Sequence, residues 1–198
     1  LWDTALPPFE MGVKAGAATV MSAFNDISGI PASANRYTMT DILRGMWGFD
    51  GLVVSDWDAV KQLIAQGVAA DRAEAAAKAI TAGLDMDMVD DVYRENLEAL
   101  VESGRVPEKV LDEAVRRILR VKFRLGLFEN PYIEELPDEQ RYLSTEARAA
   151  ARELAAESMV LLKNRGRTLP VAGDVRRIAL MGPMAENRAD LMGSWWGQ

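Results

Sequence analysis

The stretch Leu52-Val53-Val54-Ser55-Asp56-Trp57 is a short apolar run that ends in a carboxylate and an indole. A run of this length, preceded by the turn-forming residues 48–51, is typical of a buried β-strand. Parallel strands are covered on both faces, so they read as continuous apolar runs rather than as an alternation of polar and apolar residues. The stretch therefore predicts a strand of a parallel sheet, with Asp56 directly after its carboxyl end.

Two further strands are predicted along the chain. Residues 17–22 form an apolar run that is released by the turn-forming residues 25–29, and residues 84–88 form a third short run after a glycine. Parallel strands need a crossover of a dozen or more residues between them, which leaves room for a helix. The alternation of strands and connecting segments predicts the α/β class.

The connecting segments carry helix signals. Thr40 or Asp41 offers an N-cap for one helix, and an alanine-rich helix is predicted over residues 73–82. A longer helix over residues 107–126 begins at a proline and carries an apolar stripe, which we expect to pack on another element. Its arginines, at positions 116–124, are interpreted as the solvated face of that helix.

The second part of the chain begins after a change in composition. Residues 130–143 are rich in proline and acidic residues, which suits an exposed linker. Ser144 can cap a helix that is expected to end at residues 163–166, and residues 178–181 read as the first strand of another α/β domain. The sequence thus predicts a first domain, a linker and the start of a second domain, over residues 1–129, 130–143 and 144–198.

Composition narrows the possible chemistry. The 198 residues are 49% hydrophobic with a formal charge of -7, so they favour a soluble globular protein and argue against nucleic-acid or anionic-membrane partners. The chain has no Cys and no His, which excludes thiol nucleophiles, Ser-His-Asp triads and most zinc sites from residues 1–198. Carboxylate side chains are therefore the remaining candidates for catalytic groups. A periplasmic and a cytoplasmic location both fit a chain without cysteine.

Asp56 is the first candidate for catalysis, because reactive groups in parallel α/β folds lie at the carboxyl ends of strands. A carboxylate there can attack an anomeric carbon if a second carboxylic acid protonates the leaving oxygen. Trp57 would offer an apolar face to a sugar ring. On position alone, Asp56 is more often a turn former or helix cap, and a general base of an unrelated barrel enzyme is a further alternative.

Several segments together resemble glycoside hydrolase family 3. Residues 53–57 resemble the nucleophile segment of that family, and Gly48-Phe49-Asp50-Gly51 precedes them at the family's usual distance. Other segments match in the same order along nearly the full chain: residues 20–25, 82–86, 151–164, 168–170, 182–183 and the loop 192–195. The similarity is closest to bacterial two-domain β-glucosidases. It implies the carboxyl-terminal part of a (β/α)8 barrel, then a linker and the start of an α/β sandwich domain.

The resemblance also assigns roles to residues. It implies a retaining β-glucosidase with Asp56 as nucleophile, a β-glucoside or oligosaccharide as substrate, and no metal or organic cofactor. Met21, Phe24 and Trp57 would line the subsite for the terminal sugar. Phe24 stands where the family usually has Tyr, so the hydrogen bond of that hydroxyl is absent. From the residues alone, Met21 reads equally well as core filler.

The resemblance implies that other site groups lie outside residues 1–198. We find only three strands before the linker, whereas a complete barrel has eight, and the chain starts without Met, so a piece of a longer protein is expected. The acid/base Glu and a Lys-His segment would belong to the missing parts, and the isolated piece is expected to be inactive and poorly folded. A β-xylosidase, a β-N-acetylglucosaminidase and an inactive sugar-binding relative remain alternatives.

Two other groups of residues have competing interpretations. Asp85 and Asp87 suggest a metal pair, but alternate residues of a strand can equally cap adjacent backbone, and we favour the second interpretation. Trp195 and Trp196 can be a sugar platform on a loop over the barrel or part of the buried second domain. The sequence does not decide between these two roles.

Overall fold

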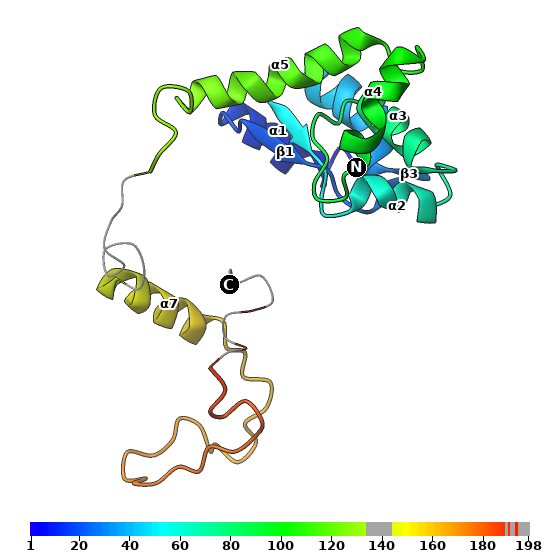
Figure 1. Cartoon of the computed structure of the whole chain (residues 1–198). Helices are drawn as coiled ribbons and strands as arrows, with labels where there is room; N and C mark the ends of the chain where they lie inside the picture. Colours follow the sequence, from blue (N-terminus) through cyan, green and yellow to red (C-terminus); the bar gives the residue numbers. More distant parts are fainter. Residues whose placement is uncertain (134–143, 189, 191–192, 194–198) are drawn as a thin grey trace. The chain divides into compact units, whose positions relative to one another are not determined.

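A computed structural model describes residues 1–133, 144–188, 190 and 193 of the chain. The chain divides into two compact units, Leu1–Glu134 and Glu135–Gln198 (Figure 1). Most of the predicted linker, residues 134–143, lies outside the described residues, so the linker stays a prediction. No helix within the described ranges is both long enough and apolar enough to cross a membrane.

The first unit combines short strands with helices. Its elements follow one another as α1 (Leu6–Lys14), β1 (Thr19–Met21), β2 (Asp26–Ile27), β3 (Ile30–Pro31), η1 (Ala32–Ala34), η2 (Tyr37–Met46), β4 (Leu52–Val54), α2 (Ala59–Ala65), α3 (Arg72–Ala82), α4 (Val92–Glu102) and α5 (Glu108–Arg124). Of these, η1 is a 3₁₀-helix and η2 is a π-helix. The predicted α/β class agrees with this architecture.

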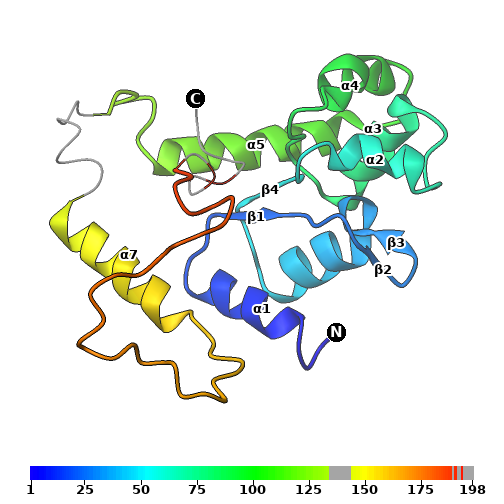
Figure 2. The ribbon, with the colours of Figure 1, turned by 90° about the horizontal axis from the view of Figure 1, so that it is seen from below.

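Strands β1 and β4 form a parallel pair, with Val20 opposite Val53 and Met21 opposite Val54. The chain between them contains the antiparallel hairpin β2–β3 and the helix η2, which together supply the crossover that parallel strands need. Figure 2 shows the two strands side by side, with α5 along one side and α1 along the other. The two predicted parallel strands are thus confirmed.

The third predicted strand, residues 84–88, is wrong in extent. It forms a single parallel bridge, between Met86 and Val54. The reason is a side chain: Oδ2 of Asp85 accepts the hydrogen bond of the Val53 amide at 2.7 Å, where a regular ladder would use a main-chain carbonyl. The segment still lies beside β4, but a carboxylate replaces part of the ladder.

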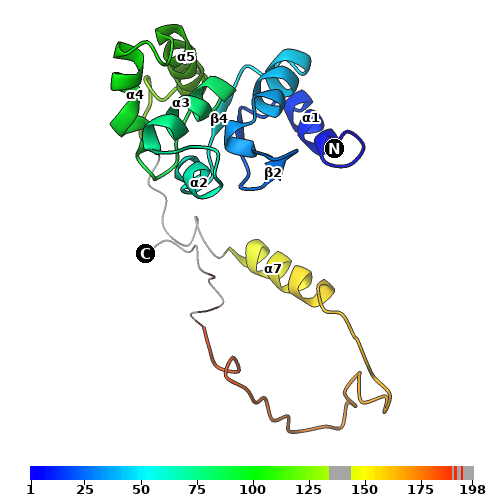
Figure 3. The ribbon, with the colours of Figure 1, turned by 90° about the vertical axis from the view of Figure 1, so that its right-hand side faces the viewer.

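The core of the first unit lies between the strands and the helices that cover them. Figure 3 shows α3, α4 and α5 on one side of β4, and α1 with η2 on the other. Burial of both faces of β4 explains why this strand reads as an unbroken apolar run. The largest fully buried apolar side chains come from η2, β4, α2 and the segments around α4: Ile42, Val53, Val60, Leu63, Leu84, Val92 and Val106.

Helix η2 begins at Tyr37, three residues before the predicted N-cap. The side chain that organises its start is Asn35, whose Oδ1 accepts a hydrogen bond from the Thr38 amide at 3.1 Å. Thr40 is inside the helix, where its hydroxyl donates to a main-chain carbonyl at the end of α3 at 2.8 Å. The predicted cap is therefore a tertiary contact between two helices.

The prediction that the arginines of α5 are solvated is wrong for Arg117, whose side chain is 21% exposed, whereas the Arg124 side chain is 53% exposed, as predicted. Arg117 donates to the buried carboxylate of Asp85 at 2.8 Å, and Arg124 forms an ion pair with Asp50 at 2.6 Å. The first contact links α5 to a buried carboxylate, and the second is a surface ion pair that leaves Arg124 in solvent. The apolar stripe is covered along only part of its length, since Leu125 at its end is exposed.

The second unit contains helix α7 (Thr145–Glu157). Ser144 is its N-cap as predicted, because the serine hydroxyl accepts the hydrogen bond of the Ala147 amide at 3.1 Å. The helix ends at Glu157, earlier than the predicted end at residues 163–166, and the apolar residues that follow it are exposed. Helix propensity alone does not extend a helix that has no surface to pack against.

The predicted strand over residues 178–181 is not formed in the described part of the second unit. Ile178 and Leu180 are both exposed there. A strand is stable only when a neighbouring strand satisfies its main-chain groups, and the described residues of this unit provide no such neighbour. Trp195 and Trp196 lie outside the described residues, so neither interpretation of them is tested.

Candidate active site

Three chain segments end at the same edge of the small sheet. The Ser22 amide, directly after β1, donates to the Val54 carbonyl at 2.9 Å, and the Ser55 amide, directly after β4, donates to the Met86 carbonyl at 2.9 Å. Carboxyl ends of parallel strands meet at one edge, which is where α/β folds place reactive groups. Asp56 is the next residue at this edge.

The carboxylate of Asp56 is held by its neighbours and still reaches solvent. Its Oδ1 accepts a hydrogen bond from the Trp57 amide at 2.7 Å. Its main-chain carbonyl accepts hydrogen bonds from the Ser55 hydroxyl at 2.9 Å and from the Ala59 amide at 3.2 Å. Among the described residues, no donor binds Oδ2, and the side chain is partly exposed. One carboxylate oxygen is therefore available to an incoming electrophile.

The three residues predicted to accompany Asp56 are partly exposed. Met21 lies opposite Val54 in the strand register, so it shares the sheet edge with Asp56. Phe24 follows β1 more distantly, and its carbonyl accepts a hydrogen bond from the Gln66 side chain at 2.9 Å. The exposed fractions of Met21, Phe24 and Trp57 are 52%, 41% and 47%, which leaves each side chain accessible. These positions are compatible with the predicted subsite, whose assignment remains a prediction.

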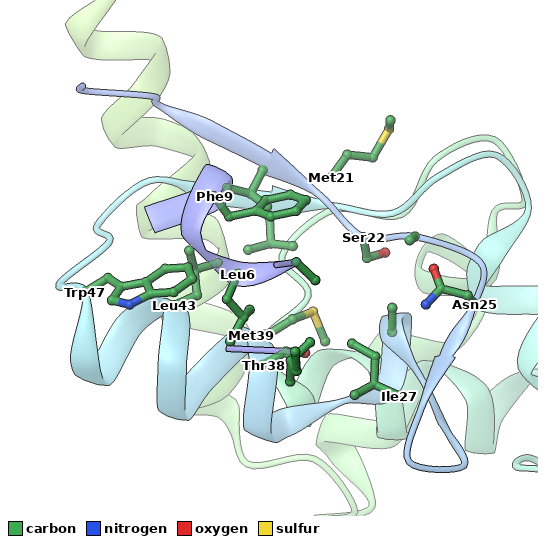
Figure 4. A pocket seen from close by; sticks show the side chains of 16 residues that line it. Leu6, Phe9, Met21, Ser22, Asn25, Ile27, Thr38, Met39, Leu43 and Trp47 are labelled. Atoms are coloured by element: carbon green, nitrogen blue, oxygen red, sulfur yellow. The ribbon is translucent and has the colours of Figure 1, made fainter. Parts of the chain in front are cut away.

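An apolar cavity of about 280 Å³ lies on the other side of β1, beneath α1 and η2 (Figure 4). Leu6 and Phe9 of α1 face Leu43 of η2 and Trp47, the residue after η2, across it. Met21 is at its rim, with a side chain that points away from the cavity in Figure 4, whereas Asp56, Phe24 and Trp57 are not part of the lining. The cavity thus does not include the Asp56 carboxylate, and no charged side chain is part of its lining.

In a comparison with protein-family models, residues 1–121 match the glycosyl hydrolase family 3 N-terminal domain. The match covers more than half of the chain and includes β1, β4 and every predicted site residue. The chain belongs to glycosyl hydrolase family 3. The family resemblance read from residues 53–57 is confirmed.

Related sequences support the same family. The chain is 44% identical over 200 residues to a periplasmic β-glucosidase of Salmonella typhimurium, covering 98% of this chain and 26% of that protein. It is 40% identical to a β-glucosidase of Rhizobium radiobacter, over 98% of this chain and 22% of that one. A β-xylosidase of Formosa agariphila is 35% identical, over 98% of this chain and 28% of that protein.

Solved structures of family 3 enzymes have the same fold in the matching part. A β-glucosidase from Listeria innocua in complex with glucose gives a TM-score of 0.75 at 44% identity, over 84% of this chain and 23% of that one. A β-glucosidase involved in saponin metabolism from intestinal bacteria gives a TM-score of 0.80 at 40% identity, over 97% and 25%. The family 3 chain thus spans about a quarter of the length of these relatives.

Beside β4 the family 3 chain has a buried ionic network that the sequence analysis missed. The Asp85 side chain, 1% exposed, accepts hydrogen bonds from Arg44 at 2.5 Å and from Arg117 at 2.8 Å. It also accepts a hydrogen bond from the Val53 amide, so the prediction that this carboxylate caps main-chain groups is confirmed. Burial lowers the pKa of Arg44, and the adjacent Asp85 acts in the opposite direction. The network fixes β4 three residues before Asp56.

Asp87, the other residue of the rejected metal pair, lies in a different environment. Its Oδ2 accepts a hydrogen bond from the Tyr93 amide at 3.1 Å, as the backbone-capping interpretation predicts. Its Oδ1 is buried and has no hydrogen-bond donor among the described residues. Burial, and then a hydrogen bond with Asp90, raises the pKa of Asp87 to about 7.

Proposed function

We propose that the full-length protein is a retaining β-glucosidase that removes terminal non-reducing β-D-glucosyl residues through Asp56. The observation that carries the proposal is the carboxylate of Asp56, partly exposed at the carboxyl end of β4 with Oδ1 bound by an amide. Its family membership and relatives of 40–44% identity that are β-glucosidases support the choice of sugar. The chain spans about a quarter of those relatives, so the activity is proposed for the whole protein.

In the proposed reaction Asp56 attacks the anomeric carbon of the substrate. The bond to the aglycone oxygen breaks as a second carboxylic acid donates its proton to that oxygen, and a covalent glycosyl-enzyme forms. The same second residue, now a carboxylate, removes a proton from water, which attacks the anomeric carbon and releases Asp56. We expect the second carboxyl group outside residues 1–198. The proposed chemistry needs no metal or organic cofactor.

The subsite for the terminal sugar is proposed to include Met21, Phe24 and Trp57. All three are partly exposed, and Met21 and Trp57 come from the two strand ends that meet beside Asp56. The indole of Trp57 suits the axial C–H face of a sugar ring, because aromatic rings provide large apolar contact surfaces. Phe24 can contribute apolar contact but no hydrogen bond, since it has no hydroxyl.

The domain assignment is part of the same proposal. Residues 1–129 would form the carboxyl-terminal part of a (β/α)8 barrel, because β1, β4 and the bridge at Met86 are parallel and carry Asp56 at their carboxyl ends. Residues 130–143 would form a linker, and residues 144–198 would begin an α/β sandwich domain. The separate compact units of the chain agree with a boundary in this region.

A β-xylosidase is the second candidate, because a 35% identical relative has that activity in its name. A β-N-acetylglucosaminidase and a sugar-binding protein without turnover are further alternatives. Hydrolysis of aryl β-glucoside, β-xyloside and β-N-acetylglucosaminide by the full-length protein separates these possibilities. We expect the highest kcat/KM for the β-glucoside, and preference for either other sugar would replace the proposed substrate.

The role of Asp56 is tested by Asp56→Asn in the full-length protein, with Asp58→Asn as a matched control. We expect Asp56→Asn to lower kcat by roughly 10³-fold or more, because a neutral amide cannot act as the nucleophile. Asp58 is two residues away in a left-handed backbone conformation that Asn tolerates, so its variant should keep activity within about tenfold. Equal losses in the two variants would contradict the assignment.

A further inference from the structure

Ser55 stands out in the segment that carries Asp56 because it is completely buried. Its exposed fraction is 0%, whereas the next two residues both reach solvent. A buried hydroxyl costs free energy unless it is hydrogen-bonded, so its contacts are informative. A serine at the end of an apolar strand can serve as a small filler, but here its hydroxyl both donates and accepts.

The two hydrogen bonds of the Ser55 hydroxyl connect different parts of the chain. The oxygen accepts the Met88 amide at 2.8 Å and donates to the Asp56 carbonyl at 2.9 Å. The main chain of Ser55 adds a third link, because its amide donates to the Met86 carbonyl at 2.9 Å. Ser55 therefore links the end of β4 to residues 86–88, which are more than 30 positions away in sequence.

These bonds act directly on the backbone of Asp56. Its carbonyl is fixed from one side by the Ser55 hydroxyl and from the other by the Ala59 amide at the start of α2. With the carbonyl held and Oδ1 bound by the Trp57 amide, the direction of the carboxylate is largely determined. Without the Ser55 hydroxyl, the Met88 amide also loses its hydrogen-bond acceptor. The main chain of residues 55 and 56 is then held by fewer hydrogen bonds and can shift.

We propose that Ser55 is a positioning residue that sets the angle and distance at which the Asp56 carboxylate meets the anomeric carbon. This inference rests on the proposed glycosidase function and adds a specific role to a residue that does not contact substrate. Attack by a nucleophile is sensitive to geometry, since a displacement of about 1 Å can cost roughly 10²-fold in rate. Loss of the hydroxyl should therefore affect the chemical step more than the binding of sugar.

The test is Ser55→Ala in the full-length enzyme, with the rate of covalent labelling by an activated 2-deoxy-2-fluoro-β-glucoside as the readout. Intact-protein mass spectrometry follows the glycosyl-enzyme over time. We expect the labelling rate constant at saturating reagent to fall at least tenfold, while the dissociation constant for glucose changes less than about twofold. A purely structural serine would lower the melting temperature without this split between labelling and binding.

Two further variants keep the test decisive. Ser33→Ala is the matched control, because Ser33 is also buried and its hydroxyl is hydrogen-bonded, to Ser22 at 2.9 Å. We expect it to lower stability and leave the labelling rate within about twofold. Ser55→Cys keeps a side chain of similar size with weaker hydrogen bonds, so its labelling rate should fall between those of the parent and Ser55→Ala. Ser55→Cys also provides the test if Ser55→Ala does not fold.

The outcomes separate the two proposals. If the parent enzyme is labelled and a folded Ser55→Ala or Ser55→Cys variant is labelled at the parental rate, Ser55 is not a positioning residue, although the proposed function stands. An equal loss of labelling in Ser33→Ala also overturns the inference. If the parent enzyme is never labelled and hydrolyses no aryl β-glycoside, the proposed function fails, and the role of Ser55 fails with it.

Discussion

The carboxylate of Asp85 binds groups from three separate parts of the first unit: Arg44 of η2, the Val53 amide of β4 and Arg117 of α5. Removing the carboxylate from this buried network leaves the charges of Arg44 and Arg117 without a counter-charge. We therefore expect Asp85→Asn to lower the free energy of unfolding by roughly 3 kcal/mol. Denaturant unfolding of the full-length protein, followed by a signal from this domain, measures the change.

The matched control is Asp91→Asn. Asp91 pairs with Arg94 on the surface, where both side chains are at least half exposed, and such pairs contribute little to stability. Its left-handed backbone conformation is one that Asn tolerates. We expect no measurable change, and a loss as large as that of Asp85→Asn would mean that burial of the ion pair is not what matters.

The raised pKa of Asp87 predicts a pH dependence of stability. Burial, followed by the interaction with Asp90, raises this pKa from 3.8 to about 7 in the folded state. The folded state therefore binds the proton more tightly than the unfolded state does. Its contribution to stability is complete below a pH of about 4 and is lost as the pH rises through about 7.

Asp87→Asn tests this dependence, because the amide is a permanent neutral substitute for the protonated carboxyl group. Its side chain can still accept from the Tyr93 amide and can donate toward Asp90. We expect the melting temperature of the variant to increase relative to that of the parent as the pH rises from 5 to 8. A difference between variant and parent that does not change with pH would show that Asp87 does not titrate in this range.

At the scale of elements, the approach of β4 to β1 depends on Gly51. A Cβ atom at this position would lie 2.1 Å from the Ala18 carbonyl oxygen, the same oxygen that accepts the Leu52 amide at 3.2 Å. We expect Gly51→Ala to destabilise the full-length protein by roughly 1–3 kcal/mol, because the two strands must separate. Thermal or denaturant unfolding measures the effect.

Gly12→Ala provides the comparison within the same unit. Gly12 is inside α1, and a Cβ atom there would have no neighbour within 4 Å. Alanine is the better helix former, so this variant should gain up to about 1 kcal/mol of stability. If both substitutions destabilise equally, the close contact at Gly51 is not what limits the packing of the strands.

The elements that the sequence predicts well are those with local signals. The N-cap of α7 and the glycine that ends α3 act within a few residues, and both are present in the structure. Helices α2 and α4 were not predicted. Each is preceded by an aspartate in a left-handed conformation without a side-chain cap, so neither has a recognisable start signal. The hairpin β2–β3 has only two residues in each strand, which is too short for a pattern.

Helix α1 was missed for a different reason. It begins with Leu6-Pro7-Pro8, and prolines are also common in turns and at the ends of elements. Proline is tolerated in the first turn of a helix, because the amide that it lacks would have no partner there. The same residues are therefore compatible with either interpretation until the packing of Leu6 is known.

At the scale of the whole molecule, the sequence identifies the family and proposes Asp56, but it does not identify what holds Asp56. The motif that carries the resemblance is continuous along the chain. The contacts of Ser55 and Asp85 join residues more than 30 positions apart, so they appear only in the folded chain. The expected strand at residues 178–181 is the opposite case, since its local pattern is clear but no partner strand is formed among the described residues.

The most direct test of the account is to locate the covalent intermediate. The full-length enzyme is treated with an activated 2-deoxy-2-fluoro-β-glucoside, digested with trypsin and analysed by mass spectrometry. Residues 45–61 form one tryptic peptide, which contains the carboxylates of Asp50, Asp56 and Asp58, so fragment ions must place the sugar among them. We predict the label on Asp56. A label on another carboxylate, or rapid hydrolysis of β-glucosides without any labelling, would contradict the assignment of the nucleophile.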